Sequence, residues 1–407
     1  MMRRPRILGA NAGSRGDAVR VRQLVSKIEG DISFFDAARS RILAINAGGV
    51  GDLHGRRVRY LTSHLQADVH LFEVDRSHSR WANAHRLWRV LKDDGPWDLA
   101  YLESSGVAGG VPLIYAAWSW GQRYIVSTGD PVSGYFRTVN GRLMGNALAL
   151  YERQLYRHCV AFVGWTPYLS GRALALGAPR AMTAEGGVDL SRFRVPTAEE
   201  RAAARSRFGL PEEALVFGMV GSLTWSRRQQ YCYGLELVEM IKLVEREDLF
   251  VLIVGDGEGR AELDRRLPEK LKNRVVFTGR VPFEEIPETV IAMDVGFVTQ
   301  TMDGLGSYRL TTKLPEYLAA GVPVAMSPIP GYYDYVGVAG WALPPRHPAS
   351  LEFHRHCAAW ADTLTRADVE RRREPARKLA ESRFDYSVIS VRFAQFVGDL
   401  LSESVRW

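Results

Sequence analysis

Short apolar runs that end in polar or glycine-rich turns alternate with helix-like segments from about residue 41 onward. In the first half of the chain the expected strands are residues 41–49, 69–74, 98–102, 124–127 and 159–164. In the second half they are residues 215–220, 250–254, 275–278, 295–298 and 323–326. Strands that alternate with helices favour parallel sheets with right-handed crossovers. The pattern therefore predicts an α/β protein with two Rossmann-like, doubly wound units.

The length of 407 residues exceeds what one ordinary core supports, so two domains are expected. The predicted N-terminal domain covers residues 41–195, and the C-terminal domain covers residues 213–380. A polar segment rich in arginine and alanine, residues 196–212, is expected to link them. Residues 1–40 are interpreted as an N-terminal extension or an extra strand and helix, because residues 6–14 are similar to residues 41–49. Residues 381–407 are expected to form a final helix.

Composition excludes several classes of protein. The hydrophobic content of 46% and the charged content of 24% are typical of a globular chain and not of a disordered or fibrous one. The most apolar stretch, residues 107–120, is shorter than the roughly 18 to 20 residues that a membrane-spanning helix needs. No secretory leader is expected at the start of the chain. Three scattered cysteines fit neither a disulfide framework nor a metal knuckle. A cytoplasmic protein is expected.

The net charge of +7 suits an anionic partner such as a nucleotide diphosphate, phospholipid headgroups or a nucleic acid. The arginines are spread along the chain and are not gathered in one block, which argues against nucleic acid. Peripheral contact with the inner face of a membrane stays open as an alternative to a freely cytoplasmic protein.

Three glycine turns of the second half place backbone amides where an anion could bind: Gly221-Ser222, Gly255-Asp256-Gly257 and the segment from Gly304 to Ser307. Such turns attract phosphate because their N–H groups are unpaired and a helix start is positive. No glycine here is followed by the Lys-Ser or Lys-Thr of a P-loop, and no turn is a dinucleotide fingerprint.

The segment 310–324 carries the most specific chemistry. Thr311 and Thr312 stand at the start of an expected helix, where hydroxyl and amide groups can contact a diphosphate. Lys313 places a cation in the first turn, against the preference of the helix dipole, which indicates a ligand anion. Glu316 follows on the same edge, and a carboxylate near a nucleotide accepts hydrogen bonds from ribose hydroxyls. A plain Lys313–Glu316 pair across one helical turn is the structural alternative.

With this segment the chain resembles the retaining glycosyltransferases of family 4. The run TTKLPEYLAAGVPVAMS is similar to the donor-site helix of that family. Four further pieces occur in the family's order: Gly187-Val188-Asp189 with Phe193, VGDGEGRAEL, VVFTGRVPFEEIPETV and FDYSVISVRFAQF. The resemblance implies the GT-B fold, in which two Rossmann-like domains face each other across a cleft and the C-terminal helix crosses back to the N-terminal domain.

The resemblance also implies roles for individual residues. Glu316 would bind the donor ribose, and Thr311 with Thr312 would contact the diphosphate. Arg280 and Val281 would frame the base through backbone groups, whereas Gly48 and Gly49 would lie beneath the donor phosphates from the opposite domain.

Four positions depart from the family's pattern. Tyr308 stands where the family has a glutamate that holds the donor sugar, and Ser222 stands where it has an arginine. Arg227 or Arg228 replaces a lysine, which keeps the charge without the shape. Asp130 is the polar residue nearest to the expected histidine of the N-terminal domain. These departures leave the choice of donor sugar in doubt.

The sequence thus predicts a retaining transferase that moves a sugar from a UDP- or GDP-linked donor to a glycan, a lipid-linked molecule or a small molecule. Arg227 and Arg228 would neutralise the diphosphate as the glycosidic bond breaks. No Asp-x-Asp triplet occurs, so neither a metal nor another cofactor is expected. One alternative is a sugar-nucleotide epimerase that uses Asp130 and Glu103 as acid and base. Another is a non-catalytic protein that binds a nucleotide sugar or a glycan.

Overall fold

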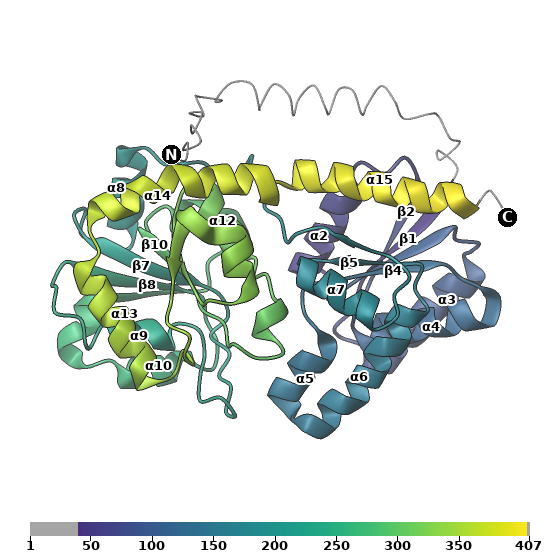
Figure 1. Cartoon of the computed structure of the whole chain (residues 1–407), viewed down its shortest axis with the longest axis horizontal. Helices are drawn as coiled ribbons and strands as arrows, with labels where there is room; N and C mark the ends of the chain where they lie inside the picture. Colours follow the sequence, from purple (N-terminus) through teal and green to yellow (C-terminus); the bar gives the residue numbers. More distant parts are fainter. Residues whose placement is uncertain (1–39, 405–407) are drawn as a thin grey trace, which may run out of the picture.

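The computed structural model describes residues 40–404 and contains two α/β domains that lie next to each other along the long axis of the molecule (Figure 1). The N-terminal extension expected at residues 1–40 lies, apart from Ser40, outside the described residues, as do residues 405–407. Each domain is built around one sheet of six strands.

The N-terminal sheet has the strand order β2-β1-β3-β4-β5-β6, and every neighbouring pair is parallel. The side chains of β3, β4 and β5 are all buried, because helices cover both faces of the sheet, and this accounts for their mostly apolar character. The strands are β1 (Arg41–Asn46), β2 (Asp68–Glu73), β3 (Leu99–Glu103), β4 (Tyr124–Thr128), β5 (Ala161–Gly164) and β6 (Ala181–Thr183). The helices are α2 (Leu53–Thr62), α3 (Arg80–Asp93), α4 (Val107–Trp120), α5 (Val132–Asn140), α6 (Arg142–Arg157) and α7 (Pro167–Ala175).

The C-terminal sheet has the order β12-β11-β10-β7-β8-β9 and is also parallel throughout. Its strands are β7 (Leu215–Val220), β8 (Leu249–Val254), β9 (Val275–Gly279), β10 (Val295–Val298), β11 (Val324–Met326) and β12 (Gly340–Ala342). Its longer helices are α8 (Ala198–Arg207), α9 (Leu235–Met240), α10 (Arg260–Arg266), α11 (Ile286–Val290), α12 (Lys313–Ala319), α13 (Leu351–Thr363) and α14 (Arg366–Leu379). Short 3₁₀ or π turns are η2 (Glu269–Arg274), η3 (Phe283–Glu285), η4 (Gly306–Tyr308), η5 (Tyr332–Val336), η6 (Gly337–Ala339) and η7 (Ala380–Phe384).

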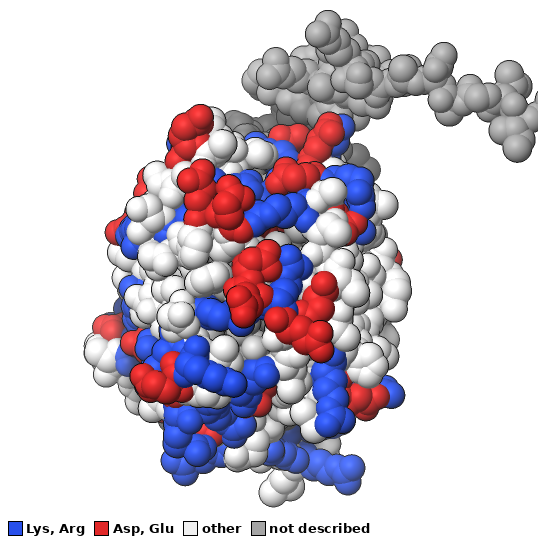
Figure 2. Space-filling model, turned by 90° about the vertical axis from the view of Figure 1, so that its left-hand side faces the viewer, with Lys and Arg blue, Asp and Glu red and all other residues white. Residues whose placement is uncertain are grey.

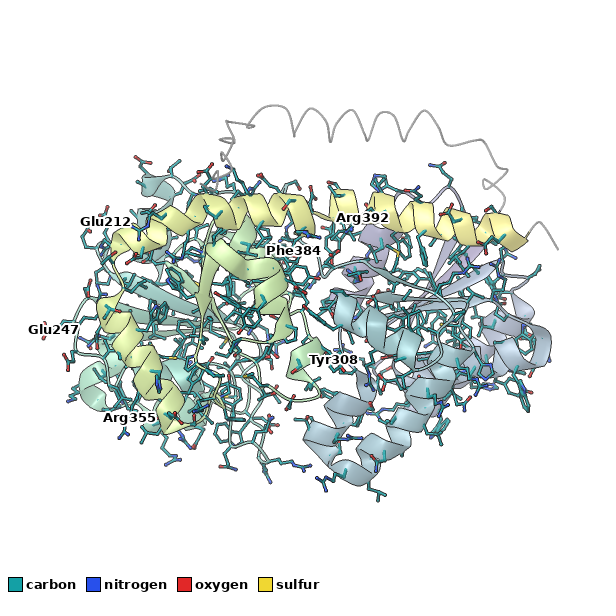
Figure 3. The ribbon with its side chains drawn as sticks, in the orientation of Figure 1. Glu212, Glu247, Tyr308, Arg355, Phe384 and Arg392 are labelled. Atoms are coloured by element: carbon teal, nitrogen blue, oxygen red, sulfur yellow. The ribbon has the colours of Figure 1, made fainter. Side chains whose placement is uncertain are left out.

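The last helix, α15 (Tyr386–Ser404), leaves the C-terminal domain and runs along the N-terminal one (Figure 1). Ile389, Phe393 and Val397 pack in the same hydrophobic cluster as Val58 and Leu61 of α2. At the crossing, Phe384 is buried in the core of the C-terminal domain, and Arg392 pairs with Glu185 at 2.9 Å (Figure 3). The predicted crossover helix is therefore confirmed.

The outer face of the C-terminal domain carries both signs of charge. Figure 2 shows basic and acidic side chains interspersed over most of this face. Several of them pair within the domain, for example Arg246 with Asp248 and Arg260 with Asp264. The positive net charge is therefore not gathered into one uninterrupted basic patch on this face. Within residues 40–404, no helix has the length and apolar character needed to cross a membrane.

Candidate functional site

A cavity of about 1100 Å³ lies between the two domains. Its walls come from segments that follow β1 to β5 of the N-terminal sheet, and from segments that follow β7, β9 and β10 of the C-terminal sheet. Both sheets thus contribute the carboxyl ends of their strands, which is where ligands bind in parallel α/β folds. The cavity is the natural place for a functional site.

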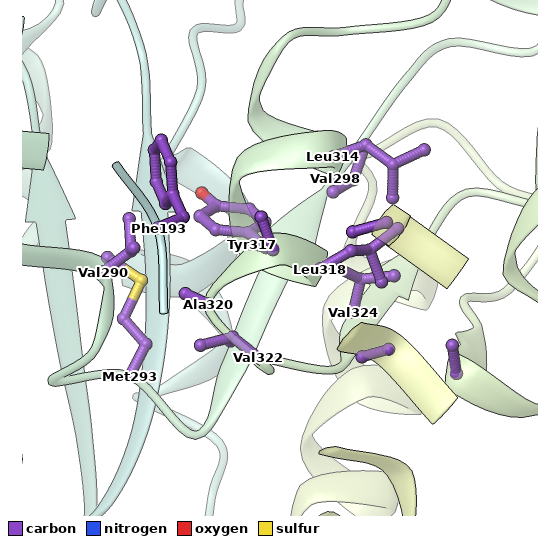
Figure 4. Close-up of a cluster of buried hydrophobic side chains, with 14 of the residues drawn as sticks. Phe193, Val290, Met293, Val298, Leu314, Tyr317, Leu318, Ala320, Val322 and Val324 are labelled. Atoms are coloured by element: carbon purple, nitrogen blue, oxygen red, sulfur yellow. The ribbon is translucent and has the colours of Figure 1, made fainter. Parts of the chain in front are cut away.

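Helix α12 brings the most informative segment to this cavity. Figure 4 shows Leu314, Tyr317 and Leu318 packed into the core of the C-terminal domain. The Val220 amide donates a hydrogen bond to the Tyr317 hydroxyl at 2.7 Å, which ties the helix to the end of β7. Gly296 of β10 leaves room for the Tyr317 ring, because a Cβ there would lie 2.3 Å from a ring carbon. The start of α12 is therefore held firmly against the cavity.

Two polar atoms at the start of α12 are buried without a hydrogen-bond partner among the described residues: Thr311 Oγ1 and Lys313 Nζ. Both residues line the cavity. A buried donor that is left unpaired costs roughly 1–3 kcal/mol. Two such groups at one cavity wall indicate that a ligand with acceptor oxygens completes their hydrogen bonding.

The ammonium group of Lys313 lies 3.6 Å from the centroid of the Tyr233 ring. Burial lowers the pKa of Lys313 to about 8, although the nearby carboxylate of Glu236 opposes the shift. Glu236 accepts hydrogen bonds from Thr299 Oγ1 at 2.6 Å and from the Tyr231 hydroxyl at 3.0 Å. The Glu236 carboxylate thus accepts its hydrogen bonds from neutral donors. The Lys313 ammonium is therefore available to bind an anion in the cavity.

Glu316 lines the same cavity one turn further along α12. Burial raises the pKa of its carboxyl to about 7, against the opposing charges of Arg56, Lys313 and Arg192. Its side chain makes no hydrogen bond within the described part of the chain. The Glu316 carboxylate is therefore available to accept hydrogen bonds from a ligand hydroxyl.

An apolar wall stands beside Glu316. Val281, Phe283 and Ile286 line this part of the cavity. The guanidinium groups of Arg56 and Arg192 lie 3.7 and 4.0 Å from the centroid of the Phe283 ring. Such a wall suits a flat aromatic ring, with cations nearby that hold the ring of Phe283 in place.

An ion pair joins the two domains across the cavity. Asp130, after β4, meets Arg309, which precedes α12, with an Oδ1–Nε distance of 2.6 Å and an Oδ2–Nη2 distance of 3.2 Å. Burial alone would lower the pKa of Arg309, but the Asp130 carboxylate outweighs it and the net shift is upward. Arg309 was not among the predicted site residues. Its only sequence signal is a basic residue directly before Leu310-Thr311-Thr312-Lys313.

The structure brings nine of the predicted site residues to the cavity: Gly48, Asp130, Gly221, Ser222, Val281, Thr311, Thr312, Lys313 and Glu316. Gly49, Gly255, Arg280 and Tyr308 lie outside its lining. Gly255 has a supporting role, because a Cβ there would lie 1.9 Å from the carbonyl oxygen of Gly221. Without that glycine the two turns could not approach each other.

The two predicted arginines lie elsewhere. Arg228 lines a second interdomain cavity of about 760 Å³, and its Nη1 donates to the Arg137 carbonyl at 3.3 Å. Arg227 lines neither cavity, because an antiparallel bridge between Ser226 and Tyr231 folds this turn back on itself. The cations at the start of α12 in the main cavity are Arg309 and Lys313. The role of Arg227 and Arg228 at the diphosphate stays a prediction.

Tyr308 also faces the second cavity, at the boundary between the domains (Figure 3). Its carbonyl oxygen accepts a hydrogen bond from Thr166 Oγ1 at 2.9 Å, and its ring lies 5.6 Å from the Arg172 guanidinium. Tyr308 thus contributes to contact between the domains.

Glu103, the acid or base of the epimerase alternative, is fully buried under the cavity floor and does not line the cavity. It accepts hydrogen bonds from Trp165 Nε1 at 3.1 Å and from the Tyr101 hydroxyl, and it lies 3.3 Å from Arg57 Nε. Burial would raise its pKa, but Arg57 and His54 outweigh burial and lower it to about 2. Glu103 is a permanently ionised anchor and not a proton donor.

No cluster of three or more His, Cys, Asp or Glu side chains that could hold a metal ion occurs among residues 40–404. The polar groups that line the cavity include cations, hydroxyls, backbone amides, two histidines, an asparagine and separate carboxylates. They suit an anionic, hydroxyl-bearing ligand.

Two facing parallel sheets, a cavity at their carboxyl ends and a helix that returns to the first domain define the GT-B fold. HepE from Anabaena in complex with UDP-glucose has this architecture, with a TM-score of 0.68 and 16% identity over 88% of this chain and 99% of that one. Sucrose-phosphate synthase from Thermosynechococcus elongatus is similar, with a TM-score of 0.68 and 14% identity over 90% and 100% of the two chains. These likenesses establish the fold.

The C-terminal domain also shows sequence similarity to known proteins. Residues 214–354 match the family described as "Glycosyl transferases group 1". The 2-deoxystreptamine glucosyltransferase of Streptomyces kanamyceticus is 34% identical over 135 residues, which is 33% of this chain and 33% of that protein. A GDP-mannose-dependent monoacylated alpha-(1-6)-phosphatidylinositol monomannoside mannosyltransferase of Corynebacterium glutamicum is 30% identical over 147 residues, 34% of this chain and 36% of that protein. The chain thus matches about a third of the length of these curated relatives.

Proposed function

We propose that this chain is a retaining glycosyltransferase that binds a nucleotide sugar in the main cavity and transfers its sugar to an acceptor. The observation that carries the proposal is the pair of buried, unpartnered donors at the start of α12, Thr311 Oγ1 and Lys313 Nζ, with the free carboxylate of Glu316 one turn away. A diphosphate next to a ribose satisfies all three groups at once. The group 1 glycosyltransferase match over residues 214–354 supports the same reading.

In this proposal the diphosphate lies against the start of α12 and the turn at Gly221. Lys313 and Arg309 neutralise the charge that builds up on the leaving diphosphate as the glycosidic bond breaks. Thr311 donates a hydrogen bond, and Gly221 with Ser222 offers backbone groups at the end of β7. Arg309 thus takes the role that the sequence assigned to Arg227 and Arg228.

The nucleoside lies on the other side of the same helix. Glu316 accepts hydrogen bonds from the ribose hydroxyls, and the wall of Val281, Phe283 and Ile286 packs against the base. Gly48 lines the cavity from the N-terminal domain and faces the phosphates in this scheme. Residues 41–195 form the acceptor domain in this scheme and residues 213–380 the donor domain, with residues 196–212 as the linker.

The donor is UDP- or GDP-linked, and the acceptor is a lipid-linked molecule, a glycan or a small molecule. Similar proteins support both choices of nucleotide, since HepE binds UDP-glucose and the Corynebacterium relative is GDP-mannose-dependent. The names of the two curated relatives include a small aminocyclitol and a phosphatidylinositol derivative as acceptors. The epimerase alternative loses support because Glu103 is buried and Asp130 is paired with Arg309.

The decisive experiment measures nucleotide release from a panel of UDP- and GDP-linked sugars. For Glu316→Ala we expect release to fall by about 10- to 100-fold, because hydrogen bonds to a charged group contribute roughly 1.5–3 kcal/mol. Glu288→Ala is the matched control, since Glu288 is an exposed carboxylate on α11.

Wild-type release rates in Glu316→Ala would contradict the proposal. Tight nucleotide binding by the wild type with no release from any donor would instead favour the non-catalytic alternative. The folded state of each variant is checked by its thermal unfolding curve.

A further inference from the structure

The helical hairpin formed by α5 and α6 projects from the N-terminal domain beside the junction with the C-terminal domain (Figure 1). Three residues of α5 line the main cavity: Val132, Tyr135 and Phe136. Val139 follows at the next position of the same spacing. Residues i, i+3, i+4 and i+7 share one face of a helix. One apolar stripe therefore runs along α5 from inside the cavity to the tip of the hairpin.

The stripe continues into solvent at the tip. Val139 is 50% exposed and Leu143, just after the turn at Gly141, is 88% exposed. Met144 and Leu150 of α6 are also exposed. A single exposed apolar side chain needs no explanation, but several on one projecting element mark a contact surface.

All exposed charged residues of the hairpin are basic. Its basic residues, Arg137, Arg142, Arg153 and Arg157, are exposed. Its one acidic residue, Glu152, is buried and paired with Arg172 of α7 at 2.7 Å. Arg137 and Arg142 lie near the turn at Gly141, whereas Arg153 and Arg157 lie toward the far end of α6. An apolar tip with exposed basic residues beside it is the combination that binds at the interface of an anionic bilayer.

The cavity end of the stripe matches this surface. Val107, Val132, Tyr135 and Phe136 line the cavity from the N-terminal domain, whereas Lys313, Arg309 and Glu316 line it from the C-terminal domain. A ligand with an apolar part would thus be held on the N-terminal side while a polar donor binds the C-terminal side.

The geometry points to a membrane-docking role for the hairpin: its tip inserts into an anionic phospholipid surface, and the stripe on α5 guides a lipid-anchored acceptor into the cavity. This inference rests on the proposed function, because it names the acceptor class of the same site. Charge complementarity commits the surface to anionic lipid and not to a second copy of the chain.

The test is flotation of the full chain with vesicles of phosphatidylcholine alone or mixed with phosphatidylglycerol. The wild type is expected to float with the mixed vesicles and to be released by salt. Leu143→Asp is expected to weaken binding by about tenfold, the factor that transfer of one leucine side chain from water contributes. Leu243→Asp is the matched control, since Leu243 is a partly exposed leucine of the C-terminal domain. Arg142→Glu provides a second variant that changes charge at the tip.

Three results would overturn the inference. They are equal flotation of the wild type with both kinds of vesicle, unchanged flotation of both tip variants, and a dimer in solution that Leu143→Asp dissociates while no vesicle is bound. Thermal stabilisation by UDP and GDP is measured in parallel on the same proteins. Because Leu143 does not line the cavity, nucleotide binding should be unchanged in Leu143→Asp. If the wild type bound the mixed vesicles but neither UDP nor GDP, the proposed function would be contradicted and the vesicle result would still stand.

Discussion

Lys313 combines two properties that a purely structural residue does not need. It is 6% exposed, and its ammonium group has no hydrogen-bond partner among the described residues. Burial lowers its pKa to about 8, because desolvation disfavours the charged ammonium that is present near neutral pH. The fold accepts this cost at a cavity wall, which is typical of a binding group and not of a packing group.

The depressed pKa of Lys313 predicts how nucleotide binding depends on pH. A bound diphosphate favours the charged ammonium, so binding raises the pKa and takes up a proton when the pH lies near or above 8. Affinity for UDP or GDP should therefore fall as the pH rises through 8, by up to about tenfold per pH unit. Isothermal titration calorimetry in buffers of different ionisation enthalpy measures both the affinity and the proton uptake.

The control for this prediction is Lys313→Met, which removes the titrating group. Its affinity should be weak at every pH, with no proton uptake near pH 8. If the wild type and Lys313→Met showed the same pH profile above pH 8, Lys313 would not be the group that meets the diphosphate.

At the scale of elements, α12 depends on a close fit with β10. The Tyr317 ring lies over Gly296, and the Tyr317 hydroxyl accepts a hydrogen bond from the Val220 amide. The helix that presents Thr311, Lys313 and Glu316 is thus positioned by packing at its rear. Gly296 does not line the cavity. A substitution there should nevertheless shift the α12 side chains that do.

Gly296→Ala tests this coupling. The added Cβ would lie 2.3 Å from the Tyr317 ring, so the ring and α12 must move. We expect a loss of about 1–3 kcal/mol in the free energy of unfolding, the usual cost of overpacking, together with weaker nucleotide binding. Urea denaturation and thermal shift with UDP and GDP measure the two effects.

The matched control is Gly171→Ala on α7, where nothing lies within 4 Å of the added Cβ. An alanine in that exposed helix should stabilise the protein by about 0.5–1 kcal/mol. An equal response of the two variants would show that α12 does not depend on the space at Gly296.

At the scale of the whole molecule, the relative position of the domains is set by contacts far apart in the sequence. Helix α15 crosses from one domain to the other (Figure 1), and the Asp130–Arg309 pair closes the cavity between residues 179 positions apart. Arg392 of α15 adds a further tie, since its guanidinium pairs with Glu185 of the N-terminal domain at 2.9 Å. The cavity exists only in this arrangement of the domains.

Asp130→Asn is expected to loosen the closed arrangement. Removing the charge leaves the partly exposed guanidinium of Arg309 without its partner, and a double-mutant cycle with Arg309→Gln should give a coupling of about 0.5–1 kcal/mol in the free energy of unfolding. Small-angle scattering should show a larger radius of gyration for both single variants. Asp264→Asn is the control, because it breaks an ion pair with Arg260 inside α10. Compactness equal to the wild type together with a coupling near zero would argue against a closing role.

The sequence predicted the regular elements well where local patterns decide them. The ten expected strands lie within two residues of their predicted ranges, except that the turn residues 47–49 were included in β1, whereas β6 and β12 were not predicted. Other elements escaped the pattern. Residues 107–120 were noted only as the most apolar stretch, and they form α4, whose buried face packs on the sheet and ends at Gly121.

What the sequence by itself determined is local: apolar runs that must be strands, glycine turns at their ends, and a short polar segment, Thr311 to Glu316, whose chemistry suits a nucleotide diphosphate. What only the tertiary structure decided is which side chains from distant segments share one cavity. It moved Arg227 and Arg228 away, brought Arg309 to Asp130, and buried Glu103 among Arg57, Tyr101 and Trp165. The physical reason is that strand and turn formation depends on neighbouring residues, whereas the direction of a loop side chain depends on how two separately formed domains pack against each other.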